Sequence, residues 1–267
     1  MYEELKKAVC VSNIELHKQK LVIYSWGNVS GIDRSAGIVA IKPSGLAYDE
    51  LTADKIVLVD LDGNIVEGQG DQAEGLDRIK PTFGGLHRIP PAAGGLKPSS
   101  DTPTHLELYR NFKAIGGICH THSPVATMWA QSCREIPCFG TTHADYFYGS
   151  IPVTKVMTKN EIQNNYELNT GKAIVRRFAN IDPMEIPAVL VANHGSFTWG
   201  KSAAVAVEAA VVLEQVAAIA LGTVTINPGQ GPIAEALLDK HYLRKHGKDA
   251  YYGQQSVRTP KEKPKKE

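Results

Sequence analysis

The segment GGICHTHS, residues 116–123, places two histidines in alternate positions after an apolar approach. The pattern predicts a short β-strand, in which successive side chains point to opposite faces, so His120 and His122 are expected on the same face as Ile118. Two neighbouring imidazoles can bind one metal ion, because imidazole suits zinc and several other divalent transition metals. The alternative is that both histidines are solvated on an edge strand. The H-x-H spacing alone does not decide between a metal site and solvated histidines.

A third histidine favours the metal site. The apolar segment Val189–Ala192 predicts a buried strand and is followed by Asn-His194-Gly, and a histidine at such a position commonly projects into a site. His120, His122 and His194, with Asp101 as a further candidate, would form a zinc site with room for substrate oxygens. Structural zinc sites are closed and mostly use cysteine. None of the four cysteines is suitably spaced, so the open, catalytic kind is favoured.

Composition excludes several classes of protein. The 267 residues are 43% hydrophobic, which supports a large core, and 29 basic against 28 acidic side chains provide no overall charge to attract nucleic acid or a membrane. Four cysteines without a C-x-x-C pair indicate reduced thiols in a cytoplasmic protein, and the N-terminus lacks a signal peptide's apolar run. The longest apolar stretch, Ala203–Leu221, contains two glutamates and predicts a buried or interface helix, not a membrane span.

Periodicity predicts both helices and strands. Helices are expected at about 2–20, from about 106, and at 123–132, 159–177, 203–221 and 233–247, and strands at 21–24, 37–42, 56–60, 64–67, around 118–122 and at 189–192. Asp62-Gly63 predicts a hairpin turn. Ser202 and Gly222 are expected to begin and end the long apolar helix.

Two segments show neither the periodicity of a helix nor that of a strand. Residues 68–95 are rich in glycine and proline and predict an irregular surface loop, which at this length is either functional or disordered. Residues 255–267 are rich in lysine and proline and predict a disordered basic tail. We therefore expect one domain over residues 1–254, with a loop insertion at about 68–95.

Two turns and one helix start offer groups for binding an anion. Residues 26–30 and 42–45 both place glycine beside serine or asparagine, and the second adds Lys42. Backbone N–H groups and a cation can bind phosphate in this way, although such turns usually only reverse the chain. Ser99, Ser100 and Asp101 precede Pro103 at the predicted helix start, where their alternative role is capping.

Several segments together resemble the class II aldolase superfamily. They are WGNVS (26–30), KPSG (42–45), KPSSD (97–101), HTHS (120–123) and NHG (193–195). TTHADYFYG (141–149), DKHYLRKHG (239–247) and AYYG (250–253) narrow the resemblance to the epimerases of that superfamily. The resemblance extends from the N-terminus to about Gln254, apart from the insertion before Lys97.

The resemblance implies a three-layer α/β/α sandwich with a central, largely antiparallel β-sheet, and a homotetramer with active sites between subunits. It implies a zinc-dependent epimerase of pentose catabolism that interconverts two phosphorylated ketopentoses, L-ribulose 5-phosphate and D-xylulose 5-phosphate, by breaking and re-forming the C3–C4 bond. The implied metal ligands are Asp101, His120, His122 and His194. The implied phosphate-binding residues are Gly27, Asn28, Lys42, Ser44, Gly45, Ser99 and Ser100. The implied catalytic residues are the acid/base groups Asp145 and Tyr252, with Tyr252 reaching a neighbouring subunit, and also Thr141, Glu167 and His241.

Two other functions stay open. One is a class II sugar-phosphate aldolase, which would release the aldehyde after cleavage; such aldolases characteristically have a catalytic glutamate where this chain has Asp101, and they lack the Thr-His-Ala-Asp segment. The other is a zinc-stabilised binding protein without catalysis, a hypothesis suggested by the insertion just before Ser99. Taken singly, Asp145 could be a turn cap and Tyr252 a packing residue.

Overall fold

The computed structural model describes residues 2–66 and 95–252 of the protein. At its centre lies a six-stranded sheet with the strand order β3-β2-β1-β4-β6-β5, in which neighbouring strands are antiparallel. The strands are β1 (Asn28–Asp33), β2 (Ile38–Ile41), β3 (Val57–Asp60), β4 (Gly117–Thr121), β5 (Ala188–Leu190) and β6 (Ser196–Gly200). β4, which carries His120, pairs on both sides, so the edge-strand alternative is wrong.

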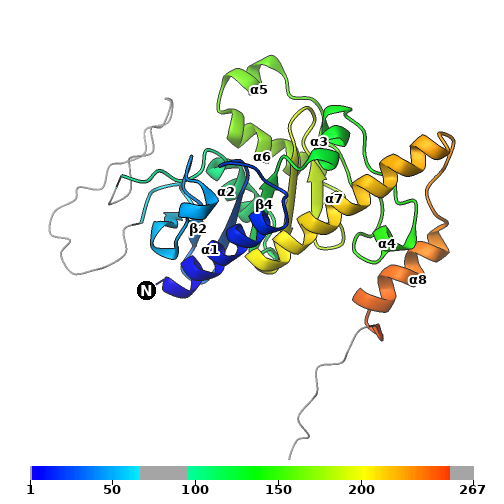
Figure 1. The fold of residues 1–267 in the computed structure, drawn as a ribbon, viewed down its shortest axis with the longest axis horizontal. Helices are drawn as coiled ribbons and strands as arrows, with labels where there is room; N and C mark the ends of the chain where they lie inside the picture. Colours follow the sequence, from blue (N-terminus) through cyan, green and yellow to red (C-terminus); the bar gives the residue numbers. More distant parts are fainter. Residues whose placement is uncertain (1, 67–94, 253–267) are drawn as a thin grey trace, which may run out of the picture.

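Helices cover both faces of this sheet (Figure 1). They are α1 (Glu3–Lys18), α2 (Thr102–Asn111), α3 (Pro124–Gln131), α4 (Thr141–Ala144), α5 (Lys159–Gln163), α6 (Tyr166–Arg177), α7 (Ala203–Ile226) and α8 (Glu235–His246). Two short 3-10 turns, Tyr48–Glu50 and Ala53–Lys55, precede β3. α1 and α7 pack against each other and against the sheet, while α2 and α6 form a second packed pair.

The alternation of side chains along β4 divides the core into two layers. Cys119 belongs to a cluster with Val9 of α1 and Val207 of α7. Its neighbour Ile118 belongs to the cluster that contains Leu108 of α2 and Ile174 of α6. These two layers confirm the expected α/β/α sandwich around an antiparallel sheet.

A glycine allows β4 to approach α7 closely. A Cβ atom at Gly117 would lie 2.3 Å from the backbone N of Ala203 and 2.3 Å from the backbone C of Ser202. The first turn of α7 therefore lies directly on the strand that leads to the histidine pair. Ser202 caps this helix as predicted, because its Oγ accepts a hydrogen bond from the N–H of Val205 (3.3 Å).

Several predicted elements differ from the structure. Residues 21–24 form no strand, since Leu21 and Val22 are buried against the α1 side of the core and Tyr24 has a positive φ of 53°. The helix expected at 159–177 is two helices, because Asn165 adopts φ 55° between α5 and α6. Gly222 does not end α7, which continues to Ile226.

Two strands of the sheet, β1 and β6, were not predicted from the sequence. β1 buries Asn28 and Ser30, polar residues that hydrogen-bond inside the fold, so it lacks a strand's usual apolar alternation. The hairpin at Asp62-Gly63 is confirmed: Val59 bridges Ile65, and the N–H of Val66 donates to the carbonyl of Leu58.

Three expectations stay untested. The tail at 255–267 and the insertion at about 68–95, except Gly95, lie outside the described residues. A single domain over residues 1–254 stays a prediction. Among the described helices, α7 is long and apolar enough to cross a membrane by length and composition alone, and 44% of its apolar window is buried inside the fold.

Candidate metal centre and phosphate pocket

His120, His122 and His194 converge, although they come from β4, the residue after it, and the β5–β6 loop. The Nε2 atoms of His120 and His122 lie 3.1 Å apart, and the ligating atoms of all three residues lie within 4.8 Å of one another. Two nitrogens on one tetrahedral zinc lie about 3.3 Å apart, given Zn–N distances of about 2.0–2.1 Å. The donor set and its spacing therefore fit a divalent transition metal.

A glycine after His194 brings its loop against β4. A Cβ atom at Gly195 would lie 2.6 Å from the carbonyl oxygen of Thr121 and 3.5 Å from Cε1 of His120. Any larger residue would therefore push His194 away from the other two imidazoles. The close approach that completes the triad depends on this position.

Neighbouring groups orient the imidazoles. Nδ1 of His120 lies 2.9 Å from the carbonyl of Ser196, to which it must donate its proton, and this leaves the Nε2 lone pair free for a metal. Nδ1 of His194 lies 3.3 Å from the Tyr166 hydroxyl. Burial, with the nearby His120, lowers the pKa of His122 to about 4 and that of His194 to about 4. Both imidazoles are therefore neutral at pH 7, as metal binding requires.

Asp101 points toward the triad and does not cap its helix. It is the N-cap residue of α2, yet its side chain accepts no capping hydrogen bond. Its Oδ2 instead accepts from Nδ2 of Asn28 (2.7 Å) and lies 4.0 Å from Nε2 of His120. Although burial alone would raise the pKa of Asp101, the nearby imidazoles and the Asn28 amide lower it below its usual value, so the carboxylate is ionised.

The triad opens into a cavity of about 540 Å³ that contains the whole predicted phosphate set. The lining residues are Ser25, Trp26, Gly27, Asn28, Lys42, Pro43, Ser44, Gly45, Ser99, Ser100, Asp101, His120, His122, Tyr166, Glu167 and His194. Gly27, with φ 69°, is required here because a Cβ atom would lie 2.7 Å from the carbonyl of His120. Glu167 is the one predicted catalytic residue in this cavity.

Lys42 is a buried cation at the edge of this cavity, only 1% exposed. Its Nζ donates to the carbonyl oxygens of Leu46 (2.5 Å) and Pro43 (3.4 Å) and lies 4.8 Å from the centre of the Tyr48 ring. Burial lowers the pKa of Lys42 to about 8. No carboxylate of the described chain forms an ion pair with it. A positive charge held only by carbonyls and a ring is well suited to an incoming phosphate.

The remaining predicted catalytic residues lie in a second cluster, outside this cavity. Asp145 follows α4, and its Oδ1 lies 3.0 Å from Nδ1 of His241 on α8. Tyr252 joins the cluster through Arg244, whose guanidinium lies 4.3 Å from the Tyr252 ring centre. α4, which begins at Thr141, packs against α8 at one end of the molecule (Figure 1). The structure therefore brings the metal and phosphate residues together but not these groups.

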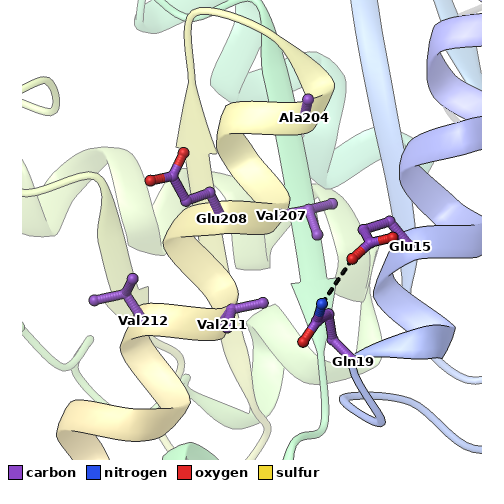
Figure 2. Close-up of a pocket in the computed structure, with 7 residues that line it drawn as sticks. All are labelled: Glu15, Gln19, Ala204, Val207, Glu208, Val211 and Val212. Atoms are coloured by element: carbon purple, nitrogen blue, oxygen red, sulfur yellow. Dashed lines mark hydrogen bonds between the residues drawn. The ribbon is translucent and has the colours of Figure 1, made fainter. Parts of the chain in front are cut away.

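A smaller cavity between α1 and α7 shows no such chemistry (Figure 2). It measures about 260 Å³ and is lined by small apolar side chains of α7 together with Glu15, Gln19 and Glu208. Glu15 accepts a hydrogen bond from its own helix neighbour Gln19 (2.6 Å). None of the three converging histidines lines it, so the larger cavity is the candidate functional site.

Four residues of these clusters were missed in the sequence: Trp26, Tyr166, Gly195 and Arg244. Trp26, Gly195 and Arg244 lie within segments that carry the family resemblance, and Tyr166 directly precedes the predicted catalytic residue Glu167, which was the available signal. Their roles depend on contacts across the fold, however. Trp26 lies 6.2 Å from the His122 ring, and Tyr166 contacts His194.

The chain resembles known proteins in sequence and in fold. The chain is 46% identical over 252 residues to the L-ribulose-5-phosphate 4-epimerase UlaF of Salmonella paratyphi A, covering 94% of this chain and 99% of the relative, and equally so to that of Salmonella typhi. Among solved structures, an L-fuculose 1-phosphate aldolase superposes with a TM-score of 0.67 at 22% identity, covering 89% of this chain and 94% of that one. The corresponding aldolase of Glaciozyma antarctica superposes with a TM-score of 0.66 at 16% identity, covering 93% and 84%.

At such identities the solved structures show the fold alone. The family model described as class II aldolase and adducin N-terminal domain matches residues 7–221, which is most of the chain and includes both the triad and the phosphate pocket. The chain therefore belongs to the class II aldolase and adducin N-terminal domain family.

Proposed function

We propose that this protein is a cytoplasmic L-ribulose-5-phosphate 4-epimerase. The observation that carries the proposal is one cavity in which three imidazoles and an ionised carboxylate lie beside an unneutralised, buried lysine. The first group suits a metal and the oxygens of a ketose, and the second suits a phosphate. The near full-length relatives that bear this name support the same substrate. Four free cysteines, three of them buried, are compatible with a reducing compartment.

In this proposal Lys42 binds the phosphate together with the loops around Gly27, Ser44 and Ser99. His120, His122, His194 and Asp101 hold a divalent cation, which we propose to be zinc. When bound, such a cation acts as a Lewis acid that stabilises negative charge on substrate oxygens. The phosphate anchor fixes the other end of the substrate, so the reacting carbons have a defined position.

The reaction needs a carbon–carbon bond to break, because C4 is not adjacent to the C2 carbonyl and carries no acidic proton. Removal of the proton from the C4 hydroxyl expels the C3–C4 electron pair into the C2 carbonyl. The products are glycolaldehyde phosphate and a three-carbon enediolate. Rotation of the aldehyde, attack on its other face and return of a proton to the oxygen give the inverted centre. Two acid/base groups on opposite faces are required, and we assign Asp145 and Tyr252.

Asp145 and Tyr252 lie outside the cavity of their own chain, so we further propose that they act in the cavity of a neighbouring copy in a homotetramer. The exposed apolar side chains of α7, among them Val205 and Ile219, provide a surface for such an assembly. His194→Asn and Asp145→Asn proteins should each be inactive alone. Co-expressed, they should regain part of the activity, because some interfaces then combine an intact triad with an intact Asp145. If verified mixed oligomers regain no activity, the proposal of a site shared between subunits is refuted.

The deciding experiment is a product assay on L-ribulose 5-phosphate with and without a chelator. D-xylulose 5-phosphate is expected, and its formation should stop on chelation while the circular dichroism spectrum persists. Accumulating glycolaldehyde phosphate would instead identify an aldolase. Absence of turnover, together with unfolding on metal removal, would identify a zinc-stabilised binding protein.

A further inference from the structure

We infer that Arg244 is a positioning residue that holds the two acid/base groups, Asp145 and Tyr252, as one rigid unit. The inference rests on the proposed function, since it concerns the residues that would move protons in that reaction. Arg244 lies on α8, far along the chain from Asp145, and its side chain is 21% exposed. Its guanidinium contacts both groups.

The contact with Asp145 is bidentate. Nη2 of Arg244 donates to Oδ1 and to Oδ2 of Asp145, both at 2.9 Å, and Nε lies 3.2 Å from Oδ1. The Asp145 side chain is 15% exposed. A planar guanidinium that binds a carboxylate through two nitrogens fixes the orientation of the carboxylate as well as its distance.

The contact with Tyr252 uses both the side chain and the backbone of Arg244. The guanidinium carbon lies 4.3 Å from the centre of the Tyr252 ring, within the range of a cation–π interaction. The backbone carbonyl of Arg244 accepts hydrogen bonds from the N–H groups of Tyr251 and Tyr252, each at 3.0 Å. One residue therefore sets the position of Tyr252 relative to Asp145.

Other groups around Asp145 do not replace this arrangement. His241 contacts Oδ1 of Asp145 at 3.0 Å through Nδ1, whereas the cations on the Tyr252 ring are those of Arg244 and Lys245. Lys245 approaches both, but only at 3.9 Å from Oδ2 and 5.2 Å from the Tyr252 ring centre. Its ammonium is a point charge without the planar fork needed to orient a carboxylate.

This geometry has a specific consequence for catalysis. In the proposed function, Lys42 and the histidines bind the substrate in the cavity. The Arg244 guanidinium lies outside that cavity and contacts the acid/base groups Asp145 and Tyr252. Loss of the guanidinium should therefore slow turnover while leaving substrate binding nearly unchanged. A loss confined to kcat shows that substrate binding is intact. Because a smaller folded fraction also lowers the apparent kcat, activity is normalised to folded, metal-loaded protein.

The test compares Arg244→Ala and Arg244→Lys with Lys240→Ala as a matched control. Lys240 lies on the same helix and stacks on the adjacent Tyr251, with its ammonium 5.3 Å from the ring centre. Steady-state kinetics on L-ribulose 5-phosphate should show kcat reduced at least about 100-fold in Arg244→Ala, with KM changed less than about 3-fold. Arg244→Lys should recover less than a tenth of the parent kcat, Lys240→Ala should retain kcat, and added guanidinium chloride at millimolar levels should partly restore Arg244→Ala.

The inference is overturned if kcat of Arg244→Ala stays within about 3-fold of the parent, or if Arg244→Lys matches the parent. It is also overturned if the loss of kcat disappears when activity is normalised to correctly folded, metal-loaded protein. A parent protein without epimerase activity refutes the proposed function instead. In that case the contact between Arg244 and Asp145 is tested by the shifts in Tm of Asp145→Asn, Arg244→Ala and the double variant. Non-additive shifts support the rigid unit, and additive shifts reject it.

Discussion

Lys42 gives the most quantitative prediction, because it carries a positive charge that is buried without a carboxylate partner. Burial lowers its pKa from 10.5 to about 8 in the folded protein. At 1.36 kcal/mol per pKa unit, this difference corresponds to about 3 kcal/mol of free energy. Between pH 8 and 10.5 the unfolded chain binds the Lys42 proton and the folded protein does not. The contribution of Lys42 to stability should therefore rise with pH across this window.

The assay is urea unfolding of the parent and of Lys42→Met at pH 7, 8, 9 and 10. All other titrating groups cancel in the difference between the two proteins. The free energy of unfolding of the parent, relative to the variant, should increase by about 2–3 kcal/mol from pH 7 to pH 10. A difference that does not change with pH would show that Lys42 is not a desolvated ammonium in the free protein, and the reasoning about the phosphate pocket would fail with it.

The same charge predicts the effect on substrate binding, with the opposite dependence on pH. A charge-assisted hydrogen bond to phosphate is worth about 1.5–3 kcal/mol, so Lys42→Met should raise KM about 10- to 150-fold at pH 7. In the parent, kcat/KM should fall as the pH rises above about 8 and the ammonium loses its proton. That fall should be absent from the already weakened variant.

The remaining predictions concern the scaffold and the orientation of the metal ligands. Gly117→Ala should lower the free energy of unfolding by roughly 3 kcal/mol or more, because the new Cβ would meet the backbone of α7. Gly222 lies in α7 with open space around it, so Gly222→Ala should raise the free energy of unfolding by about 0.5–1 kcal/mol. Thermal melts of both variants check this. Glu214→Gln should lower the free energy of unfolding by about 1–2 kcal/mol, because the Glu214 carboxylate accepts hydrogen bonds from the N–H groups of Val125 and Ala126 at the start of α3 (2.8 and 2.9 Å). Glu208, an exposed position on the same helix as Glu214, provides the control, and an equal loss in Glu208→Gln would contradict this cause. Tyr166→Phe should weaken metal binding about 10-fold by removing the hydroxyl partner of His194, as measured by competition with a chromogenic chelator, and unchanged affinity would exclude that role.

Local patterns in the sequence were enough to find the candidate metal ligands on β4 and the cap of α7. The alternation of side chains in a strand places His120 and His122 on one face, and their Nε2 atoms are indeed adjacent. Ser202 caps α7 as its position before an apolar run predicts. These features depend on neighbouring residues only, so a reading of the chain in order can find them.

Tertiary packing decided how those pieces combine. β1 was missed because it is stabilised by buried polar contacts of Asn28 and Ser30 and not by an apolar alternation. Asp101 stands at a helix start and would be taken for a cap, yet the Asn28 amide turns its carboxylate toward His120. The sequence by itself determined which residue types and spacings exist for metal and phosphate binding. Only the tertiary structure decided that Gly195 lets His194 reach the other imidazoles, and that Asp145 and Tyr252 form a separate cluster around Arg244. The reason is that each arrangement depends on close contacts between segments far apart in the chain.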